Sequence, residues 1–232
     1  MRVLALDTAM NGCTAGVLDT ESGLCVAASE RMSRGHAEKL VPLIQSVLTQ
    51  ARLDFSDLGL ICTTVGPGAF TGLRIGLSTA RALGLALNIP VTGVTTLNVL
   101  ASAYFAEHRT DKNLLVLIET KRTDFYGQLF DAEGCALCEP FALPAETIIN
   151  ACLDKAAVLI GDASVRFLSL LHDRQKSAVE AVDGFEIPDP AFIARIGYAL
   201  RKSGDNDSVA EPLYLRSADV SQSKRAQRII ED

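Results

Sequence analysis

The stretch Val65-Gly-Pro-Gly-Ala-Phe-Thr-Gly-Leu-Arg-Ile-Gly76 decides the fold class of this chain. It closes a continuous apolar run, Leu58 to Val65, which predicts a buried strand. Gly66-Pro67-Gly68 breaks the strand, and the residues from Thr71 to Leu87 have the spacing of a helix. A buried strand, a tight glycine turn and a long helix together indicate an α/β fold.

The same kind of pattern surrounds this stretch in the first half of the chain. Strands are predicted at Val3–Asp7, Cys13–Asp19, Leu24–Arg31 and Val91–Val94. Helices are predicted at about His36–Ala51 and Leu97–Ala106. Pro42 falls inside the first of these helices, where it should kink the helix or mark a late first turn.

The second half repeats this order with weaker signals. Strands are predicted at Leu114–Thr120, Phe125–Phe130, a short third segment after the turn at 131–134, Val158–Gly161 and Ala178–Val182. Helices are predicted near Pro144–Leu153, Val165–Leu171 and Pro190–Lys202. Each half is therefore predicted to contain three strands in a meander, followed by a helix, a strand and a second helix.

Two such copies in tandem predict an α/β fold of two actin-like (ASKHA, ribonuclease H-like) halves, each a mixed sheet with flanking helices. The polar residues 107–112 interrupt the apolar pattern between them. We therefore expect an N-terminal half at 1–105, a C-terminal half at 106–216 and a polar tail at 217–232. Fold alone says nothing about activity.

The glycine turn invites a phosphate-binding interpretation, because free amides at a helix start bind anions. However, no Gly-Lys-Ser/Thr ends the loop, and Thr71 stands where a dinucleotide fingerprint needs its third glycine. Asp7 and Thr8 end the first strand, where an acidic residue of an actin-like fold can help to hold Mg²⁺. A residual nucleotide loop of Asp7, Thr8, Gly66 and Gly68 thus stays open beside a purely structural role.

Small residues mark one face of the helix after this loop. Gly72, Gly76, Ala80 and Gly84 recur every four residues and therefore line a single stripe. Glycine inside a helix costs about 0.5–1 kcal/mol relative to alanine, so the stripe suggests close approach of another backbone. That backbone can belong to the same chain or to a second subunit.

Bulk properties and the reactive side chains narrow the function classes. The formal net charge of −6 disfavours a protein that grips nucleic acid alone. No run approaches a membrane span and Asp7 interrupts the first apolar run, so we expect a cytoplasmic protein. The three histidines lack metal-pair spacing, and Cys135 and Cys138 form a lone CxxC that we interpret as two hairpin thiols. No metal, cofactor or complete catalytic set is expected.

Four segments resemble the TsaB (YeaZ) family. They are Leu4-Ala-Leu-Asp-Thr-Ala9, Val65 to Gly76, Pro90-Val-Thr-Gly-Val-Thr-Thr-Leu97 and Glu211-Pro-Leu-Tyr-Leu-Arg216. The resemblance is strong over residues 1–104, thin over the second half, and returns at 211–216. The second segment is also similar to the paralogous family TsaD, which carries an HxxxH metal pair just after the next strand.

Thr96 and Leu100 stand where that metal pair would be, and neither side chain can replace an imidazole on a transition metal. The resemblance therefore points to the TsaB side of the pair. It implies a non-catalytic subunit that binds TsaD and TsaE, and the complex transfers threonylcarbamoyl from threonylcarbamoyl-AMP to N6 of adenosine 37 of tRNA. No binding of ATP or Mg²⁺ by this chain is expected, and contact with tRNA is expected indirectly, through the complex.

The family also implies where the partner binds. Its N-terminal helices mediate the contact with TsaD, and homodimers when the subunit is alone. Here those helices are about His36–Ala51 and Thr71–Leu87. The expected partner interface comprises Leu40, Leu43, Ile44, Val47, Gly72, Gly76, Ala80 and Gly84.

Two other functions remain alternatives. The first is an ATP-binding enzyme of the actin-like fold, against which the glycine-poor hairpin turns argue. The second is a peptidase-like protein that acts on TsaD, for which no nucleophile–base pair is evident. Whether the basic residues of the tail, 224–228, contact tRNA is left open.

Overall fold

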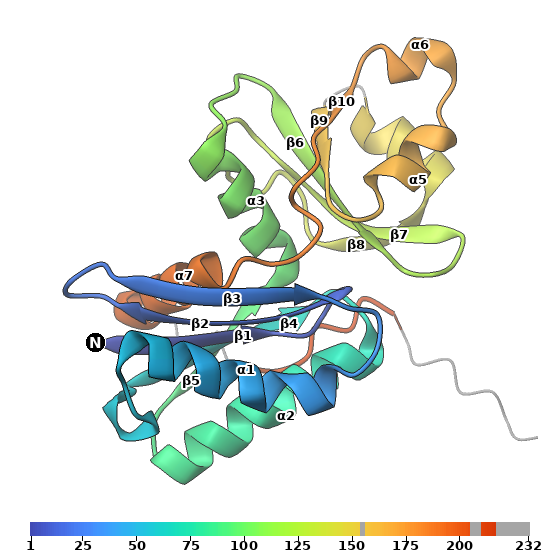
Figure 1. The fold of residues 1–232 in the computed structure, drawn as a ribbon. Coiled ribbons are helices and arrows are strands. Elements are labelled where there is room, and N and C mark those ends of the chain that lie inside the picture. Colours follow the sequence, from blue (N-terminus) through green and yellow to red (C-terminus); the bar gives the residue numbers. More distant parts are fainter. Residues whose placement is uncertain (154–155, 205–209, 217–232) are drawn as a thin grey trace, which may run out of the picture.

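A computed structural model describes residues 1–153, 156–204 and 210–216 of the chain. The first half is built on a five-stranded sheet in the order β3-β2-β1-β4-β5 (Figure 1). Its strands are β1 (Arg2–Asp7), β2 (Gly12–Asp19), β3 (Cys25–Arg31), β4 (Leu60–Gly66) and β5 (Val91–Thr95). Its helices are α1 (His36–Ala51), the short 3₁₀ turn η1 (Phe55–Asp57), α2 (Phe70–Leu87) and α3 (Thr96–Glu107).

The second half repeats this topology. Its sheet has the order β10-β9-β6-β7-β8. The strands are β6 (Asn113–Glu119), β7 (Asp124–Phe130), β8 (Phe141–Pro144), β9 (Ala156–Ile160) and β10 (Glu180–Ala181). The helices are α4 (Ala145–Ile148), the π-helical turn η2 (Ile149–Leu153), α5 (Ser164–Ser169), α6 (Asp173–Lys176) and α7 (Pro190–Ser203).

The two sheets pair their strands in the same way. In each, the first strand pairs antiparallel with the second and parallel with the fourth, and the third and fifth strands lie at the edges. This repeat confirms the predicted architecture of two tandem actin-like halves. The predicted element types are also confirmed, with ends that shift by a few residues.

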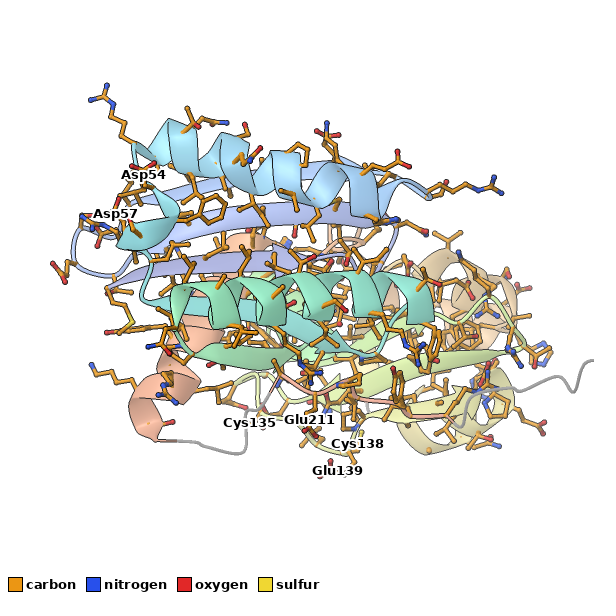
Figure 2. The ribbon with its side chains drawn as sticks, turned by 90° about the horizontal axis from the view of Figure 1, so that it is seen from below. Asp54, Asp57, Cys135, Cys138, Glu139 and Glu211 are labelled. Atoms are coloured by element: carbon orange, nitrogen blue, oxygen red, sulfur yellow. The ribbon has the colours of Figure 1, made fainter. Side chains whose placement is uncertain are left out.

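Both faces of the first sheet are covered by helices because β1 is apolar on both sides. Leu4 and Leu6 point toward α1 and α2, which lie side by side on one face (Figure 2). Val3 and Ala5 point to the opposite face, where Ile193 of α7 packs on them. The sheet is therefore the middle of three layers (Figure 1).

The position of α7 corrects the expected domain boundary. This helix lies on β1, β2, β4 and β5 of the first sheet rather than on the second sheet (Figure 1). Its Gly197 packs against Cys62 of β4, and Pro190 packs against Gly16 of β2. The assignment of 106–216 to the second half was wrong for α7, because the apolar face of Val3 and Ala5 is covered by Ile193 and Ala194 of this helix together with Val99 of α3.

Helix α3 joins the two halves through a shared core. Leu97, Leu100 and Tyr104 pack with Leu114 and Phe130 of the second sheet. Because this core contains residues of both halves, their contact is apolar and close-packed at this point.

Three local predictions differ from the structure. The third strand of the second half begins at Phe141, after an isolated bridge at Ala136. Helix α6 was not predicted. Helix α1 begins at His36, so Pro42 is inside the helix and not in a late first turn. In the described part of the chain, no helix has the length and hydrophobicity to cross a membrane.

Candidate functional site

The turn after β1 and the glycine loop before α2 lie against each other. The Ala69 amide donates a hydrogen bond to the Ala9 carbonyl oxygen over 2.7 Å, and the Thr8 hydroxyl donates to the Gly72 carbonyl oxygen over 2.6 Å. A Cβ at Gly68 would overlap the Ala9 carbonyl oxygen. The loop therefore fills the space beside the first hairpin turn, where a phosphate would need to approach.

Asp7 lies beneath this turn, fully buried. Its Oδ1 accepts hydrogen bonds from the Thr64 hydroxyl and from the Ala9 amide. Its Oδ2 has no partner among the described residues. Burial raises the pKa of Asp7 to about 6, although hydrogen bonds from Thr64 and Ala9 oppose the shift.

The structure thus brings Asp7, Thr8, Gly66 and Gly68 together, as a nucleotide loop would require. However, Asp7 and Thr8 are closed off from solvent by the chain itself. Gly66 has a positive φ of 116° and lies against Leu213, which leaves no open phosphate cradle there. The geometry favours the structural interpretation of this loop.

The glycine stripe of α2 contacts the chain's own sheet. A Cβ at Gly72 would overlap the Thr8 carbonyl oxygen, and one at Gly76 would lie 2.9 Å from the Thr8 hydroxyl oxygen. Gly84 lies against Val91, and Ala80 is fully buried in the same core. The expectation that this stripe faces a partner was wrong, because the backbone that needs the close approach belongs to the same chain.

The four apolar residues expected on the partner face are buried as well. Leu40, Leu43, Ile44 and Val47 are at most 5% exposed and pack in the core between α1 and the sheet. Helical periodicity identifies an apolar face but not what covers it. These side chains stabilise the fold and are not available to a second subunit.

The outward surface of the same two helices has little charge. From Val41 to Ala51, α1 carries no charged side chain, and the same is true of α2 from Ala82 to Leu87. Val41 is 46% exposed and Leu85 is 86% exposed. We call this surface the uncharged face; its exposed residues are Val41, Pro42, Gln45, Ser46, Thr49 and Gln50 of α1 and Ala82, Leu85 and Ala86 of α2. Exposed Arg81, one turn before Leu85, borders this face, and its guanidinium group is bound to the Ala210 carbonyl oxygen.

A large groove lies at the N-terminal ends of α1 and α2, between the two halves. Its volume is about 1050 Å³. It is lined by the segments 33–38 and 67–75 of the first half, by Tyr126 and the turn 119–122 of the second half, and by residues 213–216. Five of the lining side chains are cationic, namely Arg34, Arg74, Lys121, Arg122 and Arg216, and two are acidic, Glu38 and Glu119.

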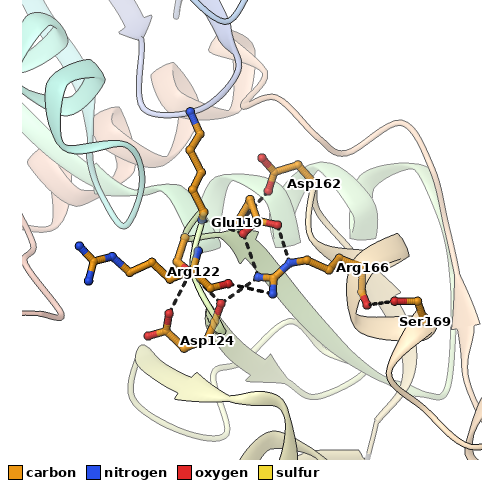
Figure 3. A network of polar contacts seen from close by, with 8 residues as sticks. Glu119, Arg122, Asp124, Asp162, Arg166 and Ser169 are labelled. Atoms are coloured by element: carbon orange, nitrogen blue, oxygen red, sulfur yellow. Dashed lines mark hydrogen bonds and ion pairs between the residues drawn. The ribbon is translucent and has the colours of Figure 1, made fainter.

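Arg166 of α5 holds the second-half wall of this groove, the turn between β6 and β7 (Figure 3). Its guanidinium group binds both carboxylate oxygens of Glu119 at 2.6 and 2.8 Å. It also donates to the carbonyl oxygens of Arg122 and Asp124, over 3.1 and 2.8 Å. Together these bonds fix the backbone that carries Lys121 and Arg122.

Asp162, in the loop between β9 and α5, also belongs to this network. Its carboxylate accepts a hydrogen bond from the Glu119 amide over 2.8 Å (Figure 3). Burial raises the pKa of Asp162 to about 6, and the nearby Glu119 carboxylate adds to the shift.

Residues 210–216, which we call the strap, close the groove from the first half. The Leu213 amide donates to the Val65 carbonyl oxygen over 2.7 Å, and Arg81 donates two hydrogen bonds to the Ala210 carbonyl oxygen. Arg216 at the far end forms an ion pair with Asp124 of β7. The strap thus connects α2 and β4 of the first half to the second half.

Two of the aromatic side chains that line this groove, Phe70 and Tyr214, lie against each other. The rings of Phe70 and Tyr214 lie 5.6 Å apart, and each residue is 46% exposed. The guanidinium carbon of Arg74 lies 3.8 Å from the centre of the Phe70 ring, and its Nε donates to the Tyr214 hydroxyl over 3.3 Å. Arg74 thus covers one face of the Phe70 ring, and the exposed parts of both rings lie next to fixed positive charge.

Other candidate residues do not form a site. Thr96 and Leu100 are buried in the core around α3. Within the described ranges, no group of three His, Cys, Asp or Glu side chains is placed to hold a metal ion. Cys135 is exposed and Cys138 accepts a hydrogen bond from the Leu129 amide; both thiols are free and lie in the loop after β7 (Figure 2).

Sequence reasoning missed the groove. Its cationic and aromatic side chains come from the loop before α1, from α2, from β7 and the β6–β7 turn, and from the strap, which are far apart in the sequence. These side chains come together only because the folded chain passes from the first half to the second and back. The segment Lys121-Arg122 was visible as a charged turn, but nothing in the sequence indicated its partner walls.

Comparisons with known proteins agree with this fold. A family model described as TsaD, tRNA N6-adenosine threonylcarbamoyltransferase, matches residues 28–219. TsaB of Escherichia coli is 31% identical over 126 residues, which cover 54% of this chain and 53% of that protein. TsaB of Buchnera aphidicola (subsp. Schizaphis graminum) is 33% identical over 124 residues, covering 53% and 58%. The chain thus spans about half the length of these curated TsaB relatives.

One relative matches along most of its length. The uncharacterized protein Rv3421c of Mycobacterium tuberculosis is 38% identical over 224 residues, covering 94% of this chain and 93% of that protein. A solved structure described as YeaZ from Pseudomonas aeruginosa has the same fold, with a TM-score of 0.77 at 24% identity, covering 92% of this chain and 99% of that one. Because a family model matches most of the chain and its named relatives are TsaB proteins, the chain belongs to the TsaB/YeaZ family of tRNA threonylcarbamoyladenosine biosynthesis.

Proposed function

We propose that this chain is a non-catalytic subunit of a cytoplasmic complex that transfers threonylcarbamoyl from threonylcarbamoyl-AMP to N6 of adenosine 37 of tRNA. It acts by binding the TsaD and TsaE homologues, and it forms a homodimer when it is isolated. The chemistry belongs to the TsaD partner, and this chain needs neither ATP nor Mg²⁺.

The uncharged face of α1 and α2 carries the proposal. Exposed helix surfaces normally carry charged residues, whereas the buried centres of protein interfaces are depleted of them. Here two neighbouring helices expose Val41 and Leu85 among small and uncharged side chains. The apolar core beneath them holds both helices rigidly, so the surface is preorganised for a partner.

Two further observations support the proposal that this chain does not itself catalyse the transfer reaction. The residues at the places of the TsaD metal pair, Thr96 and Leu100, lie in the apolar core around α3. The first hairpin turn is packed against the glycine loop, and its Asp7 is enclosed. A nucleotide would have to displace this packing in order to bind there.

The test is co-purification with the TsaD homologue of the source organism. We expect Leu85→Glu to abolish co-elution in gel filtration, because it places a charge on the most exposed apolar side chain of the uncharged face. Val165→Glu is the matched control, since Val165 is also exposed, at 71%, but lies on α5 of the second half. A Leu85→Glu variant that still elutes with TsaD would contradict the proposed interface.

A substitution in the glycine stripe is unsuitable for this test. Because Gly76 contacts Thr8 and Thr63 of the chain's own sheet, a large side chain there would disturb the fold itself. The exposed positions separate loss of partner binding from loss of folding, and circular dichroism on each variant checks this separation.

A further inference from the structure

The groove between the halves has a positive lining on an acidic protein. Its lining contains five cationic side chains and two carboxylates, whereas the whole chain has a formal net charge of −6. One of the five cations, Arg216, is paired with Asp124, so Arg34, Arg74, Lys121 and Arg122 supply the positive charge of the groove. One of the two carboxylates, Glu119, is bound through both oxygens by Arg166. Such a local concentration of positive charge in a concave site attracts an anionic ligand.

The aromatic side chains indicate which kind of anion. Phe70 and Tyr214 each expose nearly half of their surface inside the groove, and Arg74 lies over the Phe70 ring. Bases of single-stranded nucleic acids stack on exposed rings of this kind while nearby cations contact the phosphates. An acidic peptide would use the cations but not the flat rings, so the combination favours nucleic acid.

The size and rigidity of the groove agree with a segment of chain as ligand. Its volume of about 1050 Å³ lies just above the roughly 300–1,000 Å³ that small-molecule pockets occupy. The wall that carries Lys121 and Arg122 is fixed by Arg166, so little ordering is needed on binding. RNA is read mainly at single-stranded loops, whose bases can leave the stack.

We infer that this groove binds a single-stranded segment of RNA, with bases stacked on Phe70 and Tyr214 and phosphates contacted by Arg34, Lys121 and Arg122. That the nucleic acid is RNA rests on the proposed function in tRNA modification; the charge and the rings require only a single strand. The chain then contributes directly to holding the tRNA while its partner supplies the chemistry.

The experiment measures fluorescence anisotropy of a labelled single-stranded RNA of about 12 nucleotides, which is within the usual site size of such proteins. It uses both the isolated chain and its complex with the TsaD homologue. We expect Lys121→Gln/Arg122→Gln to weaken binding about tenfold at low salt, because two phosphate contacts are lost. The slope of log K against log salt should fall by about 1.4, at 0.7 per lost contact with a single strand.

The matched control is Arg201→Gln/Lys202→Gln at the end of α7, which removes the same charge outside the groove. It should bind RNA as the unmodified chain does. Phe70→Ala should weaken binding about fivefold or more without changing the salt slope, because stacking involves no counterion release. A thermal unfolding curve on each variant shows that the fold is retained.

Three results would overturn the inference. The first is unchanged RNA affinity in Lys121→Gln/Arg122→Gln. The second is displacement of the RNA by polyglutamate together with no effect of Phe70→Ala, which would assign the groove to an acidic protein segment. The third is displacement of the labelled RNA by ATP that is present at a lower concentration than the RNA. This result would assign the groove to a small nucleotide.

The failure of this inference and that of the proposed function can be told apart. The groove variants should still elute with the TsaD homologue, because the uncharged face is intact in them. Loss of RNA binding with co-elution retained supports the groove. If the unmodified chain failed to co-elute, the proposed function would be contradicted, while RNA binding by the isolated chain would still decide the role of the groove.

Discussion

At the scale of single residues, Asp7 is the most unusual group in the chain. It ends β1 fully buried, and one of its two oxygens has no partner in the described part of the structure. Thr64 and Ala9 donate to the other oxygen and offset part of the cost of burying the charge. Burial still dominates, so the pKa of Asp7 rises to about 6.

This shift predicts a pH dependence of stability. Because the folded-state pKa of about 6 lies above the ordinary value of 3.8, the folded state binds the Asp7 proton more tightly than the unfolded state does. The contribution of Asp7 therefore favours the fold at low pH and is lost as the pH rises through about 6. Asp7→Asn should remove about 2–3 kcal/mol of this variation between pH 4 and pH 7.

Urea unfolding of both proteins across this pH range measures the effect. Asp162 has a pKa shifted in the same direction and is unchanged in the variant, so part of the slope should remain. Glu107→Gln, on the exposed end of α3, controls for the loss of one carboxyl group. If the free energies of unfolding of Asp7→Asn and the unmodified chain differed by a constant amount at every pH, a raised folded-state pKa of Asp7 would be ruled out.

At the scale of elements, α2 has two faces with different roles. Its inner stripe of Gly72, Gly76, Ala80 and Gly84 allows the helix to lie close to β1, β4 and β5. Its outer face, with Leu85, is uncharged and exposed. The same helix thus anchors itself to the sheet and presents the surface that we propose for the partner.

Gly72→Ala separates intrinsic helix propensity from packing. Alanine favours the helix by about 0.5–1 kcal/mol relative to glycine. However, its Cβ would overlap the Thr8 carbonyl oxygen, and displacing backbone costs about 1–3 kcal/mol. We expect a net loss of about 1–2 kcal/mol in the free energy of unfolding, measured by urea denaturation.

Ser78→Ala is the control for this substitution, because Ser78 lies on the exposed face of the same helix. It should leave stability unchanged or raise it slightly. Gain of stability in Gly72→Ala would mean that α2 can move away from the Thr8 carbonyl without loss.

At the scale of the whole molecule, three of the links between the two halves within the described residues involve whole elements. Helix α3 shares a core with both sheets, α7 returns from the second half to cover the first sheet, and the strap runs from α2 to Asp124. These links explain why the second half cannot be assigned to one continuous range of sequence. They also place the walls of the groove.

The strap depends on Arg81, whose guanidinium group donates twice to the Ala210 carbonyl oxygen. Arg81→Gln should loosen the strap and speed amide exchange at Leu213 about tenfold, since hydrogen bonds to charged groups contribute about 1.5–3 kcal/mol. Hydrogen exchange with mass spectrometry of the peptide around Leu213 measures this. Arg109→Gln, which lies outside the strap contacts, is the control, and equal exchange in both variants would assign the strap's order to other contacts.

The sequence by itself determined the repeated order of strands and helices. The buried run before Val65, the glycine loop and the period of α1 and α2 each predict local structure, because burial and helical spacing leave a pattern in neighbouring residues. The segment Val65–Gly76 also carries the family resemblance. The sequence did not determine what each apolar face contacts, since the same period serves a core and an interface.

Only the tertiary structure decided these contacts. It placed Leu40 and Val47 in the chain's own core and the glycine stripe against the chain's own sheet. It also returned α7 to the first half and assembled the groove from segments more than 100 residues apart. Such arrangements depend on how distant apolar faces cover one another, and this competition leaves no local signal in the sequence.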